Sequence, residues 1–237
     1  MDKEIRLEDV TGFSAAFDAD PKNLLALNAV TKTDLHTVVL NREVVNRTHH
    51  TYSDLIETPE ATAQGGTGRC WIFAALNTFR LMAMEKLGLK QFELSQAYPM
   101  FWDKLEKANF FLENIIETRE EPLDGRLVMW LLSDPLPDAG QWDMLVNLIE
   151  RYGAVPKTVM PETQSSFSSG TMNRMLVHKL REFARVLREM HGRGAGVDDM
   201  RDRKAELLET FYRMLCIHLG RPPSRFLWEW RDKDGTF

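Results

Sequence analysis

The sequence predicts an α+β fold that is mostly helical. Three long stretches, residues 70–87, 173–191 and 197–219, have the apolar spacing expected of helices. Two short stretches, residues 37–40 and 226–230, are β-branched or aromatic and are typical of strands. The 237 residues include thirteen phenylalanines, so the chain can bury a substantial core.

Residues 1–69 are predicted to form an N-terminal segment that ends in a loop. Residues 21–31 have leucines on one side and predict a helix, whereas residues 37–40 predict a strand. Residues 59–68 contain Pro and Gly and predict the loop that precedes the next helix.

Residues 70–191 are predicted to form a helical subdomain around a central helix. That helix is expected at residues 70–87, because Gly88 can adopt the left-handed conformation that ends a helix. Ser95 is a suitable N-cap for a second helix that extends through Leu112.

The rest of this subdomain is predicted from its proline and glycine positions. Residues 127–132 are apolar and fit either a helix or a buried turn, and residues 141–152 predict a helix closed by Gly153. The serine-rich residues 163–171 predict a surface loop. A basic amphipathic helix follows at 173–191, and its cations (Arg174, Lys179, Arg181, Arg185 and Arg188) are expected on a solvated face.

Residues 197–237 are predicted to form a helix and part of a β-hairpin. Glycines at 192, 194 and 196 predict a hinge before the helix. Residues 226–230 alternate as a half-buried strand, and residues 233–235 predict a hairpin turn. Only two residues remain for the returning strand, so we expect the chain to stop within the hairpin and Trp228 and Trp230 to need a further partner.

The segment from Gln64 to Trp71 carries the clearest chemical signal. Cys70 follows a glycine-rich approach and begins an apolar helical run. Free N–H groups and the positive end of the helix dipole favour a thiolate there, and Arg69 is expected to add a cation beside it. The Gln64 amide, six positions upstream, could donate to an oxyanion together with the Cys70 N–H.

A lone cysteine before apolar residues is more often a buried core residue, but Gln64, the glycines and Trp71 favour a nucleophile here. The segment resembles the nucleophile motif of papain-like cysteine peptidases. Within them it is similar to the bleomycin hydrolase and aminopeptidase C branch, where Arg precedes the cysteine. One departure is Ala63, where many relatives carry Asn. The stretches similar to that branch are residues 68–77, 92–98, 138–143, 152–156, 219–223 and 228–235.

The resemblance implies a papain-like fold with the nucleophile Cys70 on the central helix and Gln64 in the oxyanion hole. It implies hydrolysis of peptide or amide bonds through an acyl-enzyme, no metal or organic cofactor, and homohexameric rings whose C-terminal tail limits cleavage to N-terminal residues. The family's catalytic His and Asn belong to a β-rich half that we expect to be missing here. None of the six histidines matches that motif, and His218 is expected to support the end of a helix.

Composition excludes several other classes of protein. A net charge of −5 and a pI near 5.7 give no basic footprint for nucleic acid. Two cysteines cannot form a disulfide framework, and neither a signal peptide nor a membrane span is expected, so the chain is predicted to be cytoplasmic. His49 and His50 fit a solvated loop better than a metal site, and Cys216 fits a core position.

Two functions outside catalysis remain open at this point. The chain could be a catalytically incomplete subunit that binds and modulates full-length relatives or other partners. It could also be a fragment with no function of its own.

Overall fold

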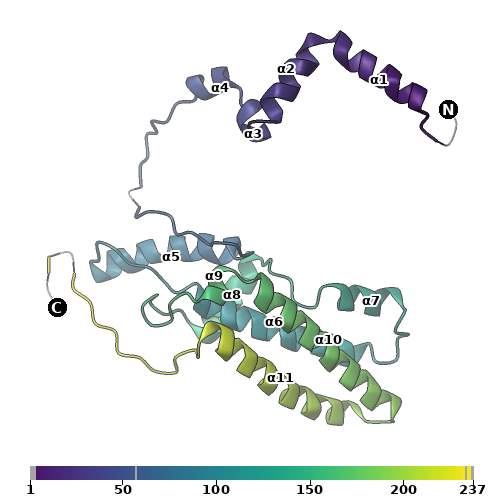
Figure 1. The fold of residues 1–237 in the computed structure, drawn as a ribbon. Helices are drawn as coiled ribbons and strands as arrows, with labels where there is room; N and C mark the ends of the chain where they lie inside the picture. Colours follow the sequence, from purple (N-terminus) through teal and green to yellow (C-terminus); the bar gives the residue numbers. More distant parts are fainter. Residues whose placement is uncertain (1–3, 57, 233, 236–237) are drawn as a thin grey trace. The chain divides into compact units, whose positions relative to one another are not determined.

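The computed structural model describes residues 4–56, 58–232 and 234–235. In these residues the secondary structure is helical, apart from isolated bridges between Gly66 and Ser168 and between Leu94 and Pro156. The chain divides into two compact units, one up to residue 56 and one from residue 58 onward (Figure 1). The predicted boundary at residue 69 lies inside the second unit, and the division into 1–69, 70–191 and 197–237 stays a prediction.

The first unit contains α1 (Leu7–Ala19), α2 (Pro21–Val30), α3 (Leu35–Val38) and α4 (Arg42–Arg47). The predicted helix at residues 21–31 is confirmed: the Asp20 side chain accepts the Lys22 N–H at 3.0 Å and so caps the helix start. None of these four helices buries a residue.

The predicted strand at residues 37–40 is wrong. These residues overlap α3, where the Asp34 side chain accepts the His36 N–H at 2.9 Å and starts a helical turn. A strand needs a neighbouring strand to satisfy its backbone, and the described part of this unit provides none. Local capping therefore decides the conformation.

The second unit holds the helices that form the core. The central helix α5 has the predicted bounds, and Gly88 ends it with a left-handed φ of 65°. The bounds are α5 (Cys70–Leu87), α6 (Ala97–Glu117), α7 (Arg126–Ser133), α8 (Trp142–Tyr152), α9 (Gln164–Phe167), α10 (Gly170–Gly192) and α11 (Val197–Leu219).

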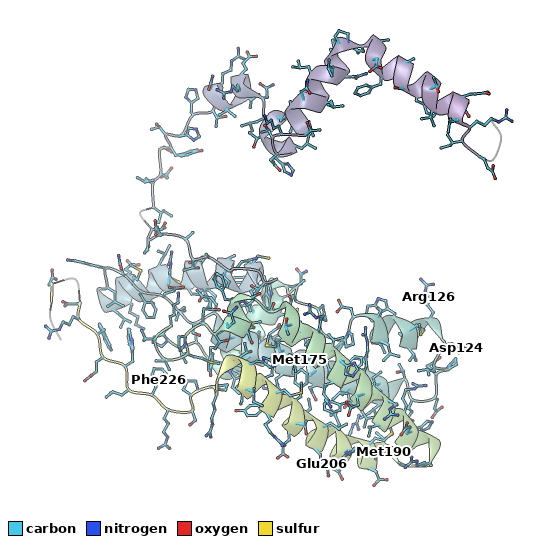
Figure 2. All side chains as sticks on the ribbon, viewed as in Figure 1. Asp124, Arg126, Met175, Met190, Glu206 and Phe226 are labelled. Atoms are coloured by element: carbon cyan, nitrogen blue, oxygen red, sulfur yellow. The ribbon has the colours of Figure 1, made fainter. Side chains whose placement is uncertain are left out.

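The core is built around α6, which packs against α7, α8, α10 and α11 (Figure 1). Phe101 of α6 and Phe211 of α11 are fully buried, and Phe101 meets Tyr212 edge to face with ring centroids 5.2 Å apart. The predicted apolar face of the last helix is confirmed, and Leu176 and Leu180 of α10 complete the packing. Met175 on the same helix is half exposed (Figure 2).

Local hydrogen bonds set several helix ends as the sequence predicts. Ser95 precedes α6, and its hydroxyl accepts the Tyr98 N–H at 3.1 Å, although Gln96 occupies the N-cap position. Helix α6 extends to Glu117, five residues beyond the expected Leu112. The apolar residues at 127–132 form a helix rather than a turn, and Gly153 closes α8 with a φ of 78°.

The prediction of a surface loop at residues 163–171 is wrong in part. This stretch contains the short helix α9, and Ser166 and Ser169 are buried. The Thr163 hydroxyl accepts the Ser166 N–H at 3.1 Å, and Thr163 N donates to the Ser166 hydroxyl at 2.7 Å. A reciprocal cap of this kind lets polar residues enter a buried position.

The cations of α10 lie on a largely solvated face, as predicted, and two of them also bind backbone carbonyls of other segments. Arg181 donates to the carbonyls of Leu132 and Ser133, both at 2.9 Å. Arg188 donates to the carbonyls of Thr118 and Glu121 at 3.1 and 2.5 Å. Because the last carbonyls of a helix lack partners inside it, Arg181 satisfies the C-terminal end of α7, and Arg188 satisfies the C-cap carbonyl of α6 and one carbonyl in the turn after it.

Residues 226–230 do not form the predicted strand. Trp228 stacks on Trp230 with centroids 4.9 Å apart, and Phe92 packs on Trp228 at 5.4 Å. Phe226 lies on the same irregular stretch (Figure 2). At the predicted hairpin turn, Gly235 N donates to the Asp232 carbonyl at 3.1 Å, while residues 233, 236 and 237 lie outside the described part. Among the described residues, no helix has the length and apolar content to span a membrane.

We expect Arg188→Ala to lower the free energy of unfolding by about 1–2 kcal/mol, because the C-cap carbonyl of α6 and a carbonyl in the turn after it lose a charged donor. Arg185→Ala on the same helix is the matched control. Arg185 is largely exposed and reaches only Glu189, so its loss should cost less than about 0.5 kcal/mol. Urea unfolding of both variants followed by circular dichroism measures the difference, and equal losses would contradict the capping role.

Candidate active site

Cys70 is the first residue of α5, and it is exposed. Arg69 holds the N-cap position without a side-chain cap, and the first helical hydrogen bond runs from Phe73 N to the Arg69 carbonyl at 3.0 Å. The Cys70 N–H therefore has no carbonyl partner within the helix. The thiol and a backbone N–H without a helical partner therefore belong to the same exposed residue.

Gln64 lies in the loop before the helix and is half-buried. Its Nε2 donates to the carbonyl of Thr67 at 2.8 Å, while the Thr67 hydroxyl donates to the Gln64 carbonyl at 2.9 Å. This reciprocal pair folds the loop back on itself. A carboxamide has two N–H groups, so one remains for another acceptor.

Arg69 does not supply the free cation that the sequence predicted. Its side chain is only 3% exposed, and Nη1 and Nη2 each contact a different oxygen of Glu162 at 2.9 Å. Nε donates to the Thr67 hydroxyl at 3.1 Å. Desolvation makes an unpaired guanidinium costly, so Arg69 turns inward to a carboxylate and fixes the loop that carries Gln64.

Glu162 is itself held by the segment around α9. The Ser166 hydroxyl donates to Glu162 Oε2 at 2.6 Å, and the Thr163 hydroxyl donates to the carbonyl of His218 at 2.9 Å. The ring of His218 lies 3.0 Å from the Ser165 hydroxyl. His218 thus sits in the last turn of α11, as predicted, and its hydrogen bonds are with the α9 segment.

Trp71, directly after Cys70, is fixed by the loop before α8. Its Nε1 donates to the Asp138 carbonyl at 3.1 Å. A Cβ on Gly140 would lie 2.5 Å from the indole ring, so the backbone passes directly over the tryptophan. Only glycine permits this approach without displacing the ring.

Two lysines of α6 hold the same loop. Lys107 donates to the carbonyls of Pro137 and Ala139 at 2.8 and 2.9 Å, and to Asp103 at 2.9 Å. Lys104, with 2% of its side chain exposed, pairs with Asp138. Sequence reasoning missed this cluster. Its one visible signal was the four-residue spacing of Asp103 and Lys107, which also fits an ordinary surface ion pair.

The burial of these groups shifts their pKa values. Burial raises the pKa of Asp103 to about 6, although Lys107 and Lys104 act in the opposite direction. Burial also lowers the pKa of Lys107. For Asp138, burial favours the neutral acid, but Lys104, Asn173 and the Gly68 N–H together hold the pKa below its usual value. Asp138 is therefore ionised near neutral pH.

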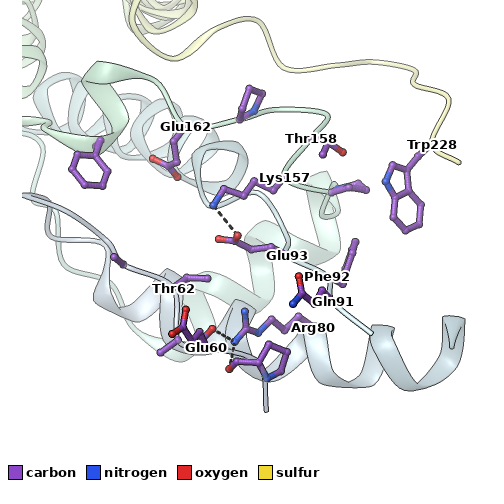
Figure 3. Close-up of a pocket in the computed structure, with 16 residues that line it drawn as sticks. Glu60, Thr62, Arg80, Gln91, Phe92, Glu93, Lys157, Thr158, Glu162 and Trp228 are labelled. Carbon is purple, nitrogen blue, oxygen red and sulfur yellow. Dashed lines mark hydrogen bonds and ion pairs between the residues drawn. The ribbon is translucent and has the colours of Figure 1, made fainter. Parts of the chain in front are cut away.

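A cavity of about 970 Å³ is lined in part by residues 59–63, in the loop that leads to Cys70. Figure 3 shows Lys157 directed at Glu93 and Arg80 directed at backbone carbonyls of residues 59 and 60, with Trp228 at one end. Thr62 and Ala63 line it. Among the described residues that form its walls, neither Cys70 nor Gln64 appears.

The contacts described for the other residues that the sequence singled out are with parts of the chain other than Cys70. His49 and His50 are exposed in an irregular segment of the first unit. Cys216 is half-buried and packs against the core. In the described part of the chain, no histidine hydrogen-bonds to Cys70, and no group of three or more His, Cys, Asp or Glu side chains could hold a metal ion.

The family model described as the Peptidase C1-like family matches residues 4–237. The chain belongs to the peptidase C1-like family. Membership agrees with the Gln64, Cys70 and Trp71 pattern and with the resemblance stated from the sequence. The catalytic roles of Cys70 and Gln64 stay predictions.

Bleomycin hydrolases and aminopeptidases C are among the relatives of this peptidase C1-like chain. Bleomycin hydrolase of Oryctolagus cuniculus is 45% identical over 222 residues, which is 92% of this chain and 80% of the rabbit protein. The Homo sapiens protein of the same name is 42% identical, covering 97% of this chain and 51% of its own length. Aminopeptidase C of Listeria monocytogenes (strain EGD-e) is 44% identical, covering 100% of this chain and 53% of its own length.

The fold agrees with a solved structure from the same group. The crystal structure of pepW from Lactobacillus rhamnosis HN001, determined as the selenomethionine derivative, matches with a TM-score of 0.91 and 42% identity. The match covers 100% of this chain and 53% of that one. This peptidase C1-like chain thus spans about half the length of pepW and of the human and Listeria relatives. A β-rich half beyond it stays a prediction.

We expect Glu162→Gln to lower the free energy of unfolding by about 3 kcal/mol, because it leaves the buried Arg69 charge without a counterion. The control is Glu120→Gln, whose partner Arg119 lies on the surface, and its effect should stay below about 0.5 kcal/mol. Denaturant unfolding compares the two. Similar small losses in both variants would show that Arg69 does not depend on this ion pair.

The raised pKa of Asp103 predicts a pH-dependent stability. Because the folded pKa is above the unfolded one, the stabilising contribution is present below about pH 4 and is lost as pH rises through about 6. The unfolding free energy of the wild type relative to Asp103→Asn should therefore fall by roughly 3 kcal/mol at most between pH 4 and 7. Asp124→Asn, on an exposed turn, is the control. A pH-independent difference for Asp103→Asn would contradict this burial effect.

Proposed function

We propose that this chain carries the nucleophile of a cysteine peptidase that hydrolyses peptide or amide bonds, with the N-terminal preference of an aminopeptidase. The observation that carries the proposal is the exposed thiol of Cys70 at the first residue of α5, next to a backbone N–H without a helical partner. Family membership and the names of the relatives, bleomycin hydrolase and aminopeptidase C, support the same chemistry.

In this proposal the Cys70 thiolate attacks the carbonyl carbon of the scissile bond. A C–S bond forms, and the carbonyl oxygen becomes an oxyanion that accepts from the Cys70 N–H and the free N–H of Gln64. Collapse of this intermediate breaks the C–N bond, the amine leaves with a proton, and a thioester on Cys70 remains. Water then hydrolyses the thioester and restores the thiol.

The amine's proton must come from a general acid, which in cysteine peptidases is a histidine oriented by a third group. None of the described histidines hydrogen-bonds to Cys70. We therefore assign the general acid to the half of the longer relatives that this chain does not cover. The homohexamer, the peptide substrates and the cytoplasmic location implied by the resemblance are part of the same proposal.

The alternative of a modulating subunit gains no support from the relatives, whose names are those of peptidases. Homology therefore favours the catalytic proposal over the binding one.

An activated ester tests the role of Cys70 as nucleophile without the need for a general acid. An aminoacyl p-nitrophenyl ester has a leaving group that needs no proton, so it should acylate Cys70 in the 237-residue chain itself. Intact-mass and peptide mass spectrometry would locate the acyl group. We expect a stoichiometric adduct on Cys70 and none in Cys70→Ala. Absence of the adduct on the wild-type chain would contradict the proposed nucleophile.

Gln64→Ala tests the oxyanion role. We expect it to slow acylation of Cys70 by at least about tenfold, because one donor to the oxyanion is lost. Alkylation of Cys70 by iodoacetamide forms no oxyanion, so its rate should stay unchanged in the same variant. Equal slowing of both reactions would mean that Gln64 only maintains the loop through Thr67.

A further inference from the structure

We propose that Asp138 is a positioning residue for Cys70, which fixes the backbone before the cysteine and the indole after it. The inference rests on the proposed function of Cys70 as the nucleophile, and it concerns a residue that touches neither the sulfur nor a substrate. Asp138 belongs to the loop between α7 and α8, far from Cys70 in the sequence.

Asp138 contacts both sides of the nucleophile. Its side chain packs directly against Gly68, two residues before Cys70, where a Cβ on the glycine would lie 2.5 Å from Cβ of Asp138. Its backbone carbonyl accepts Nε1 of Trp71, one residue after Cys70, at 3.1 Å. A single residue therefore fixes both the backbone just before α5 and the side chain of Trp71, the second residue of that helix. This matters because Arg69 gives the helix start no side-chain cap.

Asp138 is in turn held by two other helices. Lys104 of α6 pairs with its carboxylate, and Asn173 of α10 donates Nδ2 to both oxygens at 3.0 and 3.1 Å. The Lys104 side chain is 2% exposed and that of Asp138 is 31% exposed. Ion pairs with one deeply buried partner are costly to break, so this carboxylate has one defined place.

The loop on either side of Asp138 is fixed as well. Lys107 donates to the carbonyls of Pro137 and Ala139, the two neighbours of Asp138 in the chain. The cluster contains the carboxylates of Asp103 and Asp138 and the ammonium groups of Lys104 and Lys107, so its charges balance.

Gly68 and Asp138 approach each other too closely for any other residue. A Cβ at Gly68 would lie 2.5 Å from Cβ of Asp138, whereas a Cβ at Gly66 would meet nothing within 4 Å. The two glycines lie in the same loop, and only one of them needs to be glycine for this contact. Gly68→Ala therefore tests the contact with Asp138, and Gly66→Ala is its matched control.

The test compares the alkylation rates of the two cysteines in the same molecule. Cys70 is exposed at the site, and Cys216 is half-buried against the core and reports general loosening. Iodoacetamide alkylation at pH 7, resolved by peptide mass spectrometry, gives both rates for the 237-residue chain. A positioning role changes Cys70 alone, whereas partial unfolding also raises the rate at Cys216.

Asp138→Asn removes the charge and places an amide NH₂ against Lys104 or Asn173, both of which are donors. We expect alkylation of Cys70 to slow by about tenfold, because the reactive thiolate depends on the backbone N–H groups that a fixed helix start presents to it. Cys216 should be unaffected, and exchange of the Trp71 indole hydrogen should accelerate. Asp134→Asn, on the same loop but exposed, should match the wild type.

Gly68→Ala is the second variant, because it separates the loop from Asp138 while leaving every charge in place. It should slow Cys70 alkylation as Asp138→Asn does, and Gly66→Ala should leave the rate unchanged. Unchanged Cys70 rates in both Asp138→Asn and Gly68→Ala would overturn the proposal, as would a parallel rise at Cys216. Failure of the proposed function is separate. It would appear as wild-type Cys70 that forms no acyl adduct with the activated ester, while hydrogen exchange at the Trp71 indole still tests the role of Asp138.

Discussion

The start of α5 depends on buried charges that must be paired. The segment from Gln64 to Trp71 is rich in glycine and has few apolar side chains with which to anchor itself. Arg69 is 3% exposed and Lys104 is 2% exposed, so each requires a carboxylate, and Glu162 and Asp138 provide them. The Arg69–Glu162 pair connects this segment to the region before α9, and the Lys104–Asp138 pair connects α6 to the loop before α8. The exposed position of Cys70 is therefore a consequence of interactions that are themselves mostly buried.

Helix α6 links this arrangement to the core. Phe101, Leu112 and Ile115 are fully buried, and α6 packs against α10 and α11. Lys104, on the same face of α6 as Phe101, and Lys107 hold the loop over Trp71. A change in core packing along α6 would therefore move the lysines and, through them, the surroundings of Cys70. The same helix supports the stability of the fold and the geometry of the candidate site.

The sequence predicted most helices well and parts of the site poorly, for physical reasons that differ. Gly88 ends α5 because glycine tolerates the left-handed conformation, which is a local property. The predicted strands at residues 37–40 and 226–230 failed because a strand needs a partner, and propensity does not supply one. Cys70 and Gln64 were evident as a motif, but the inward turn of Arg69 depends on Glu162, 93 residues away. Pairings at such sequence distances leave no periodic signal in a single sequence.

The most direct test of the central claim is the alkylation rate of Cys70 relative to Cys216 when a buried ion pair is broken. Iodoacetamide would be reacted at pH 7 with the 237-residue chain and with its Glu162→Gln variant, and each cysteine followed by peptide mass spectrometry. The account predicts that Glu162→Gln changes the rate at Cys70, because the loop before α5 loses the pairing of Arg69, while Cys216, which packs against the core, keeps its rate. Unchanged rates at both cysteines, or a parallel rise at both, would contradict the claim that paired charges fix the start of α5.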